Sequence, residues 1–316
     1  MNPRLLAAVL SVASTGSFVG VGFFQQRLTS YFSIFTILGL RTFVGGICLL
    51  AYVLILEGTF STVTLKSLLF FWWTLLFVCT ILLYGFAFAG RPLPDVYLLA
   101  ALMPIFVIFI EITFFRRYFR LEAALPLGTM LLSAIAPSLY KILVLRSTGI
   151  VSLGSFFAFG AAVVHAIWVV VGRVVQEDTQ SASPAGRALY MFLIGGLLLI
   201  IASNIDAVHI VEASVRGLRF QTRYLEYAEL PDNLNLFFTG FLAAASVLLL
   251  IYALSFDTPM NIAPYQYTVP AWATAVTILA APHDSENSAT VLWIMAVSSC
   301  VIVACAFWLH KVQSRL

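Results

Sequence analysis

Ten apolar stretches follow one another along the 316-residue chain, and each is about as long as a lipid bilayer is thick. A helix rises about 1.5 Å per residue, so roughly 20 apolar residues cross about 30 Å of hydrocarbon. The stretches lie at 5–24, 33–55, 68–89, 95–115, 123–144, 150–171, 188–204, 235–255, 262–280 and 291–309. This pattern predicts an all-α integral membrane protein with ten transmembrane helices.

Composition also indicates that lipid is the main solvent of this chain. Hydrophobic residues make up 61% of it and charged residues 10%, which would leave a soluble domain covered in apolar surface. Ten spans with short connections leave no room for a separate soluble catalytic domain. The net charge of +3 is spread over loops and forms no basic stripe, so we expect no nucleic-acid partner.

The cysteines predict neither a metal site nor a disulfide framework. Cys48, Cys79, Cys300 and Cys305 all lie in apolar spans, and none forms the closely spaced pairs with histidine that zinc requires. We expect small core residues at these positions and no cofactor. The apolar run from Arg4 to Phe24 ends without a small-residue cleavage site, which favours a retained first helix over a signal peptide.

Basic residues in the loops predict the orientation of the chain. With both termini inside, the inner loops hold a small majority of the Lys and Arg residues, including the cluster Arg116, Arg117 and Arg120. The positive-inside rule therefore predicts a multi-pass protein of the cell (inner) membrane with cytoplasmic termini. The longest connection, about 205–234, reads as an amphipathic helix on the outer surface, either a lid or a plain connector.

The two halves of the chain carry a faint internal resemblance. The run FVGGICLL at 43–50 is similar to FLIGGLLL at 192–199, and Pro104 and Pro270 lie in the fourth and ninth spans. Because five is an odd number, a second copy of a five-helix unit must enter the membrane the other way up. We therefore predict two inverted five-helix repeats, 1–146 and 147–316, a plan that many secondary carriers use to form a midplane site.

Five short motifs carry a resemblance to a known family. They are Ser14-Thr15-Gly16-Ser17-Phe18, Leu40-Arg41-Thr42-Phe43, Leu102-Met103-Pro104-Ile105-Phe106, Ala161-Ala162-Val163-Val164-His165-Ala166-Ile167-Trp168 and Ala263-Pro264-Tyr265-Gln266-Tyr267. With these motifs the chain resembles the ten-helix EamA-like members of the drug/metabolite transporter superfamily. The resemblance implies a carrier of an amino acid, a nucleotide-like compound or an organic cation, working by alternating access. It also implies that spans 1, 3, 4, 6, 8 and 9 surround a central cavity.

Arg41 and His165 are ionisable side chains inside predicted spans. A charge at mid-helix costs roughly 2.5 to 3.5 kcal/mol unless it faces a cavity or a partner. Arg41 could attract an anionic group of the cargo, or it could be a structural arginine that binds carbonyls or reaches the interface. His165 shares a helical face with Trp168, and both a proton-coupled site and a hydrogen-bonded packing residue fit this placement.

Two spans carry polar stripes at helical spacing, and we expect both to face inward. The stripe of the first span is Ser11, Ser14, Phe18, Gly22 and Gln25, with Gly16 and Gly20 as a close-contact pair on another face. The stripe of the ninth span is Tyr267, Pro270, Thr274 and Thr277, behind Pro264, Tyr265 and Gln266. A cavity lining and helix packing explain the ninth stripe equally well. Its two prolines can kink the helix and leave carbonyls available to a ligand.

The other charged side chains of the predicted spans are expected near helix ends. Glu111 and Lys141 are placed where their charged groups reach water, and no carboxylate occupies the middle of a span. This pattern favours exchange or facilitated diffusion over proton or sodium coupling. Tyr84 and Tyr252 stand near span ends, as interface anchors or at the border of a cavity.

These observations predict a substrate-binding site without catalytic or metal-binding residues. Its members are Ser14, Phe18, Arg41, Tyr84, Met103, His165, Trp168, Tyr252, Tyr265, Gln266, Tyr267 and Thr274. Aromatic residues make up 14% of the chain and can stack on a planar cargo or lie over an organic cation. The expected partners are a small-molecule substrate and the lipid bilayer, for a monomer or a homodimer.

A membrane-embedded enzyme is the alternative to a secondary transporter. An intramembrane serine hydrolase would pair Ser17 or Ser155 with His165, but no spacing in the sequence selects this pair. A channel would show charged rings or a repeated carbonyl filter, and neither is visible. We therefore predict a transporter and not an enzyme.

Overall fold

The computed structural model describes residues 2–29, 32–58, 68–90, 93–116, 121–143, 153–178, 182–203 and 230–280, with short pieces between 293 and 308. The elements in these ranges are helical, and no strand occurs among them. The long helices are α1 (Pro3–Leu28), α2 (Ile34–Tyr52), α3 (Leu68–Gly90), α6 (Leu121–Leu143), α7 (Leu153–Asp178), α8 (Pro184–Ala202) and α10 (Leu230–Phe256). The short elements are α4 (Leu93–Ala100), α5 (Met103–Phe115), α11 (Pro259–Ile262), α12 (Val269–Ala280), a π-helical turn η1 (Val53–Glu57) and a 3-10 segment η3 (Ala263–Thr268).

Six helices in the described part of the chain are long and apolar enough to cross a membrane. They are Pro3–Leu28, Ile34–Glu57, Leu68–Gly90, Leu153–Glu177, Pro184–Ala202 and Asn233–Phe256. They coincide with predicted spans one, two, three, six, seven and eight. The prediction of an all-α membrane protein is therefore confirmed. The count of ten spans stays a prediction, and most of the predicted amphipathic connection lies outside the described residues.

Spans four and nine were each predicted as one helix, and both are broken. In span four, α4 ends at Ala100 and α5 begins at Met103, with Pro104 in its first turn. In a continuous helix the ring of Pro104 would clash with the carbonyl of Ala100, four residues earlier, and the proline offers no N–H. In span nine, η3 replaces the α-helix between Pro264 and Pro270. Such breaks are tolerated at membrane depth where protein or a water-filled cavity surrounds them.

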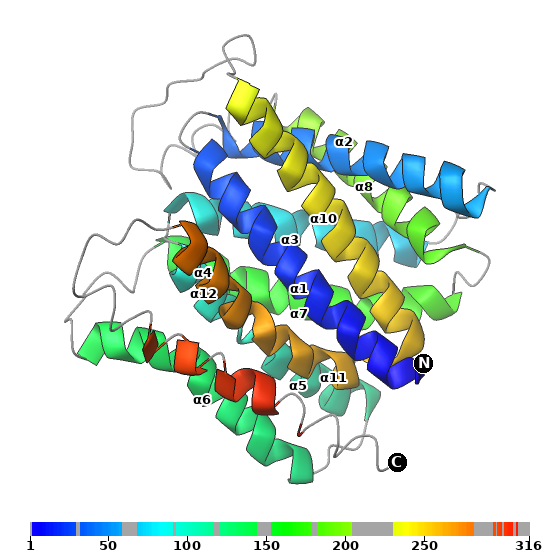
Figure 1. The fold of residues 1–316 in the computed structure, drawn as a ribbon. Helices are drawn as coiled ribbons and strands as arrows, with labels where there is room; N and C mark the ends of the chain where they lie inside the picture. Colours follow the sequence, from blue (N-terminus) through cyan, green and yellow to red (C-terminus); the bar gives the residue numbers. More distant parts are fainter. Residues whose placement is uncertain are drawn as a thin grey trace.

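The long helices pack in pairs that join the two halves of the chain (Figure 1). α1 lies along α10, α3 along α7 and α2 along α8. If α1, α2 and α3 correspond to α7, α8 and α10, the first two contacts exchange and the third maps onto itself. An inverted repeat would give this pairing. The boundary at 146/147 stays a prediction, because residues 144–152 are outside the described ranges.

Local features of α2 and α8 match as well. Both helices have 19 residues and begin after a serine whose side chain caps the first turn. Ser33 Oγ accepts a hydrogen bond from Thr36 N at 3.1 Å, and Ser183 Oγ accepts one from Gly186 N at 2.9 Å. Each cap satisfies a backbone donor that the helix start would otherwise leave unpaired.

The helix α2 crosses α10 at very short range. A Cβ atom added to Gly240 would lie 2.7 Å from Val44 Cβ and 2.9 Å from the carbonyl oxygen of Arg41. A Cβ added to Gly45 would lie 2.9 Å from the carbonyl oxygen of Gly240. Backbone atoms cannot move aside as a side chain can, so this crossing requires glycine on both helices.

A tryptophan pair holds α3 against α7. Trp73 is fully buried, and its Nε1 donates a hydrogen bond to the carbonyl oxygen of Trp168 at 2.9 Å. The two indole rings are nearly parallel, with centroids 5.5 Å apart. Close packing and hydrogen bonds of this kind replace the hydrophobic effect as the force between helices in lipid.

Substituting Gly240 by alanine should destabilise the fold. The added methyl group meets the backbone of α2, and overpacking of this kind costs about 1–3 kcal/mol. We expect Gly240→Ala to lower the midpoint of thermal unfolding of the purified protein. Gly128→Ala is the matched control, since no described atom lies within 4 Å of a Cβ at this position. Equal midpoints for the two variants would show that the α2–α10 crossing is not a tight contact.

Substituting Trp73 by phenylalanine should also lower stability. The change removes the hydrogen bond to Trp168 and part of the stacked ring, a loss of about 1–3 kcal/mol. Thermal unfolding measures this loss. Trp72→Phe serves as the control, because the side chain of Trp72 is 53% exposed and faces away from the core. If Trp72→Phe lowered the midpoint as much as Trp73→Phe, the Trp73–Trp168 contact would not be what stabilises the packing of α3 against α7.

Candidate functional site: the central cavity

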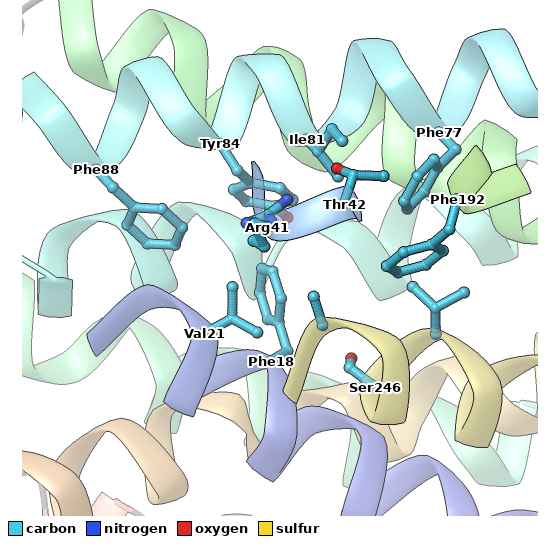
Figure 2. A pocket seen from close by; sticks show the side chains of 12 residues that line it. Phe18, Val21, Arg41, Thr42, Phe77, Ile81, Tyr84, Phe88, Phe192 and Ser246 are labelled. Atoms are coloured by element: carbon cyan, nitrogen blue, oxygen red, sulfur yellow. The ribbon is translucent and has the colours of Figure 1, made fainter. Parts of the chain in front are cut away.

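Two adjoining compartments lie in the middle of the helix bundle. The arginine compartment has a cavity volume of about 50 Å³, and Figure 2 shows its wall. Its lining residues are Phe18, Val21, Arg41, Thr42, Phe77, Ile81, Tyr84, Phe88, Phe192, Ala243, Ser246 and Val247. The histidine compartment has a cavity volume of about 60 Å³ and is lined by Ser14, Phe18, Phe77, Thr80, Ile81, Tyr84, His165, Trp168, Ser246, Val247, Leu250 and Gln266. Since half of each lining is shared, we treat them as one central cavity.

Helices from both halves of the chain build this cavity. The first half contributes α1, α2 and α3, and the second half contributes α7, α8, α10 and the 3-10 segment η3. Arg41, whose backbone contacts Gly240 at the α2–α10 crossing, and Trp168, which stacks on Trp73, both line this cavity. The packing that stabilises the fold therefore also positions the lining side chains.

Arg41 is the basic residue of the arginine compartment. Arg41 is 5% exposed, so the guanidinium lies inside the bundle. Nη1 donates a hydrogen bond to Gln25 Oε1 at 2.6 Å. No described residue forms an ion pair with Arg41. The guanidinium is thus held by a neutral amide, and its other donors are left for water or a ligand.

Gln25 extends this arrangement from α1. It lies at the end of the predicted inward stripe, in which Ser11, Ser14, Gly22 and Gln25 are all buried. Its Oε1 accepts the bond from Arg41, while its Nε2 is buried without a hydrogen-bond partner among the described residues. A buried donor left without a partner costs about 1–3 kcal/mol. Gln25 lines neither compartment, so it holds Arg41 from behind the cavity wall.

Phe18 stands at the centre of an aromatic wall. Its ring centroid lies 5.0 Å from that of Tyr84 and 5.5 Å from that of Tyr97, both edge to face. The Tyr97 hydroxyl donates to the carbonyl oxygens of Phe18 and Val19, which ties α4 to α1. The broken fourth span thereby supports the wall without lining either compartment. Edge-to-face pairs of this kind prefer a fixed geometry.

His165 and Trp168 form the α7 side of the histidine compartment. Their ring centroids are 5.6 Å apart, and His165 also lies 6.0 Å from Tyr84. Trp168 Nε1 is buried without a hydrogen-bond partner among the described residues. The helical face that the sequence assigned to His165 and Trp168 thus lies beside Phe18 and Tyr84.

Hydroxyl and amide side chains join α1 to the second half of the chain. Ser14 Oγ donates to the carbonyl oxygen of Ser246 at 2.8 Å, and Ser246 Oγ donates to that of Ser14 at 3.0 Å. Gln266 Nε2 donates to Ser11 Oγ at 2.9 Å. The polar stripe of α1 therefore serves in helix packing as well as in lining the cavity.

The structure brings seven of the predicted site residues to this cavity: Ser14, Phe18, Arg41, Tyr84, His165, Trp168 and Gln266. Tyr265 and Tyr267 are buried in a separate apolar cluster, because the 3-10 turn of η3 directs them there. Met103 is buried in the main core, and the hydroxyl of Tyr252 lies 3.5 Å from that of Tyr52 near one end of the bundle. The side chain of Thr274 lies outside the described residues.

The placement predicted for Glu111 was wrong. This residue was expected to reach water near a helix end, but it is 2% exposed within α5. The break after Ala100 shifts the centre of span four and leaves Glu111 packed inside the bundle. It does not line either compartment. The prediction for Lys141 falls on a side chain outside the described residues.

The sequence did not single out several lining residues. Thr42, Phe77, Phe192 and Ser246 line the cavity, and only the position of Thr42 beside Arg41 hinted at this role. Phe77 and Phe192 belong to uniformly apolar helices, in which periodicity does not separate a cavity face from a lipid face.

Comparisons with known proteins agree with this architecture. The fold is similar to that of a protein of known crystal structure, with a TM-score of 0.67 over 96% of each chain and 14% sequence identity. At this identity the likeness concerns the fold alone. No curated protein sequence matches the chain. Residues 152–305 match the model of the EamA-like transporter family. Through these residues the second half of the chain is similar to the EamA-like transporter family of the drug/metabolite transporter superfamily, and together with the long apolar helices this similarity supports a multi-pass membrane protein.

Proposed function

We propose that the protein is a secondary transporter that moves a small organic metabolite across the cell (inner) membrane by alternating access. The central cavity carries this proposal, because it lies between helices of both halves and holds polar groups inside an apolar bundle. Intramembrane ionisable residues that face a cavity mark substrate pathways in many carriers. The cavity would hold the cargo midway, with both termini on the cytoplasmic side.

Three hydrogen bonds that close one end of the bundle support alternating access, two of them within the second half and one between the halves. Arg173 Nη1 donates to the carbonyl oxygen of Leu254 at 2.7 Å, and Gln176 Nε2 donates to that of Ile251 at 3.1 Å. Ser183 Oγ donates to Glu57 Oε2 at 2.6 Å. These bonds tie the ends of α7, α8, α10 and η1 on what would be the cytoplasmic side. Opening the cavity to this side would require some of them to break.

The hydrolase alternative finds no support in the geometry. Ser155 and His165 are ten positions apart on the continuous helix α7, which separates them by roughly 15 Å along its axis. Ser17 Oγ donates to the carbonyl oxygen of Ala13 at 3.1 Å, and His165 contacts aromatic rings instead. A serine nucleophile needs a base within hydrogen-bond reach. Neither serine forms a hydrogen bond with His165 in the described part of the chain.

Transport should depend on the cavity wall. Purified protein in liposomes should show saturable uptake that a trapped internal solute stimulates, in a panel of carboxylates, amino acids, nucleosides and organic cations. Phe18→Ala removes the central ring and should raise the half-saturation concentration about tenfold or more. Phe43→Ala should not change it, since Phe43 is 52% exposed on the outer face of α2. Uptake that never saturates and ignores internal solute would contradict the carrier function.

A further inference from the structure

The arginine compartment contains a buried cation without a buried anion opposite it. Arg41 donates its hydrogen bond to the neutral amide of Gln25, and none of the residues that line either compartment is Asp or Glu. An uncompensated charge inside a membrane protein is costly. A ligand that brings the opposite charge would remove this cost.

The Arg41 guanidinium offers further donors to this compartment. Its Nη1 is bound by Gln25 of α1, which lines neither compartment, whereas Arg41 itself lines the arginine compartment. A guanidinium has five N–H donors and no acceptor, so a complementary cargo carries acceptor atoms at its polar end.

The remaining wall is apolar and largely aromatic. Phe18, Phe77, Tyr84, Phe88 and Phe192 surround the space next to Arg41 (Figure 2). Apolar walls with a small number of placed polar groups are typical of sites that bind a small organic molecule. The cargo therefore needs an apolar body behind its charged end.

We propose that the cargo is an organic monocarboxylate with an apolar, ring-sized body, whose carboxylate binds Arg41. This inference rests on the proposed transport function and names its substrate class. The planar guanidinium matches a carboxylate with two parallel hydrogen bonds. One arginine balances one negative charge, whereas a phosphate monoester carries about −1.5 to −2. An organic cation would meet Arg41 with no lining carboxylate to offset the repulsion.

Binding of four matched probes tests the substrate class. Phenylacetate, phenylacetamide, phenethylamine and phenyl phosphate share a phenyl ring and differ in the charge of the polar end. We expect phenylacetate to bind the purified protein in lipid nanodiscs about tenfold or more tightly than the other three. The readout is the ligand-dependent rise in the midpoint of thermal unfolding.

Variants of Arg41 assign the preference to its charge. Arg41→Gln should abolish the preference for phenylacetate over phenylacetamide and still bind the amide, which shows that the variant is folded. Arg41→Lys should retain part of the preference. Arg27→Gln is the control and should leave it unchanged, since Arg27 is exposed at the end of α1, over the Phe23 ring.

Several results would overturn the monocarboxylate assignment. These are equal binding of acid and amide, tighter binding of phenethylamine or phenyl phosphate, a preference that survives in Arg41→Gln, and no binding of any probe. Each of them leaves the transport function standing if another solute shows saturable counterflow in liposomes. Absence of counterflow for every solute would instead overturn the transport function itself.

Discussion

The close crossing of α2 and α10 is the contact on which the cavity depends. Gly240 lies against the backbone of Arg41, so the helix that carries the buried cation is fixed by direct packing of main chain on main chain. Lipid tails are as apolar as the core, and helices associate there through close packing and hydrogen bonds. A larger residue at the crossing would separate the helices and displace the guanidinium from Gln25. Stability and the geometry of the site are therefore set by the same contact.

Much of this architecture follows from patterns along single helices. The apolar stretches predicted the six long membrane helices, and the spacing of Ser11, Ser14 and Gln25 predicted the inward face of α1. The expected close contacts of Gly16 and Gly20 are made with Trp272 and Leu242. The prolines of spans four and nine indicated weak points, but only the structure shows that they break the helices. A proline removes a donor in every context, whereas the size of the break depends on the neighbours.

The parts that escaped prediction depend on contacts between helices. Gln25 and Arg41 lie on different helices, and nothing in their spacing indicates that Nη1 and Oε1 meet at 2.6 Å. The same holds for the stacked indoles of Trp73 and Trp168. Tyr267 looked like a cavity residue because an α-helical spacing was assumed from Tyr267 to Thr277. The 3-10 turn changes the angle between successive side chains, so that spacing does not apply.

The two halves differ at the position that matters for the charge of the cargo. Arg41 precedes the Gly45–Gly46 pair of α2, and the corresponding position before Gly195–Gly196 of α8 is Met191, which is buried. Equivalent positions of the two halves thus hold a cation, Arg41, and a thioether, Met191. If the halves exchange conformations during transport, a carboxylate bound to Arg41 would move with α2 while the apolar body passes along the shared wall of Phe18, Phe77 and Tyr84. The polar end of the cargo would then keep one partner through the cycle, and only its apolar contacts would change. Apolar contacts suit this role because they are non-directional, whereas a hydrogen bond to a buried charge is strong only in one geometry.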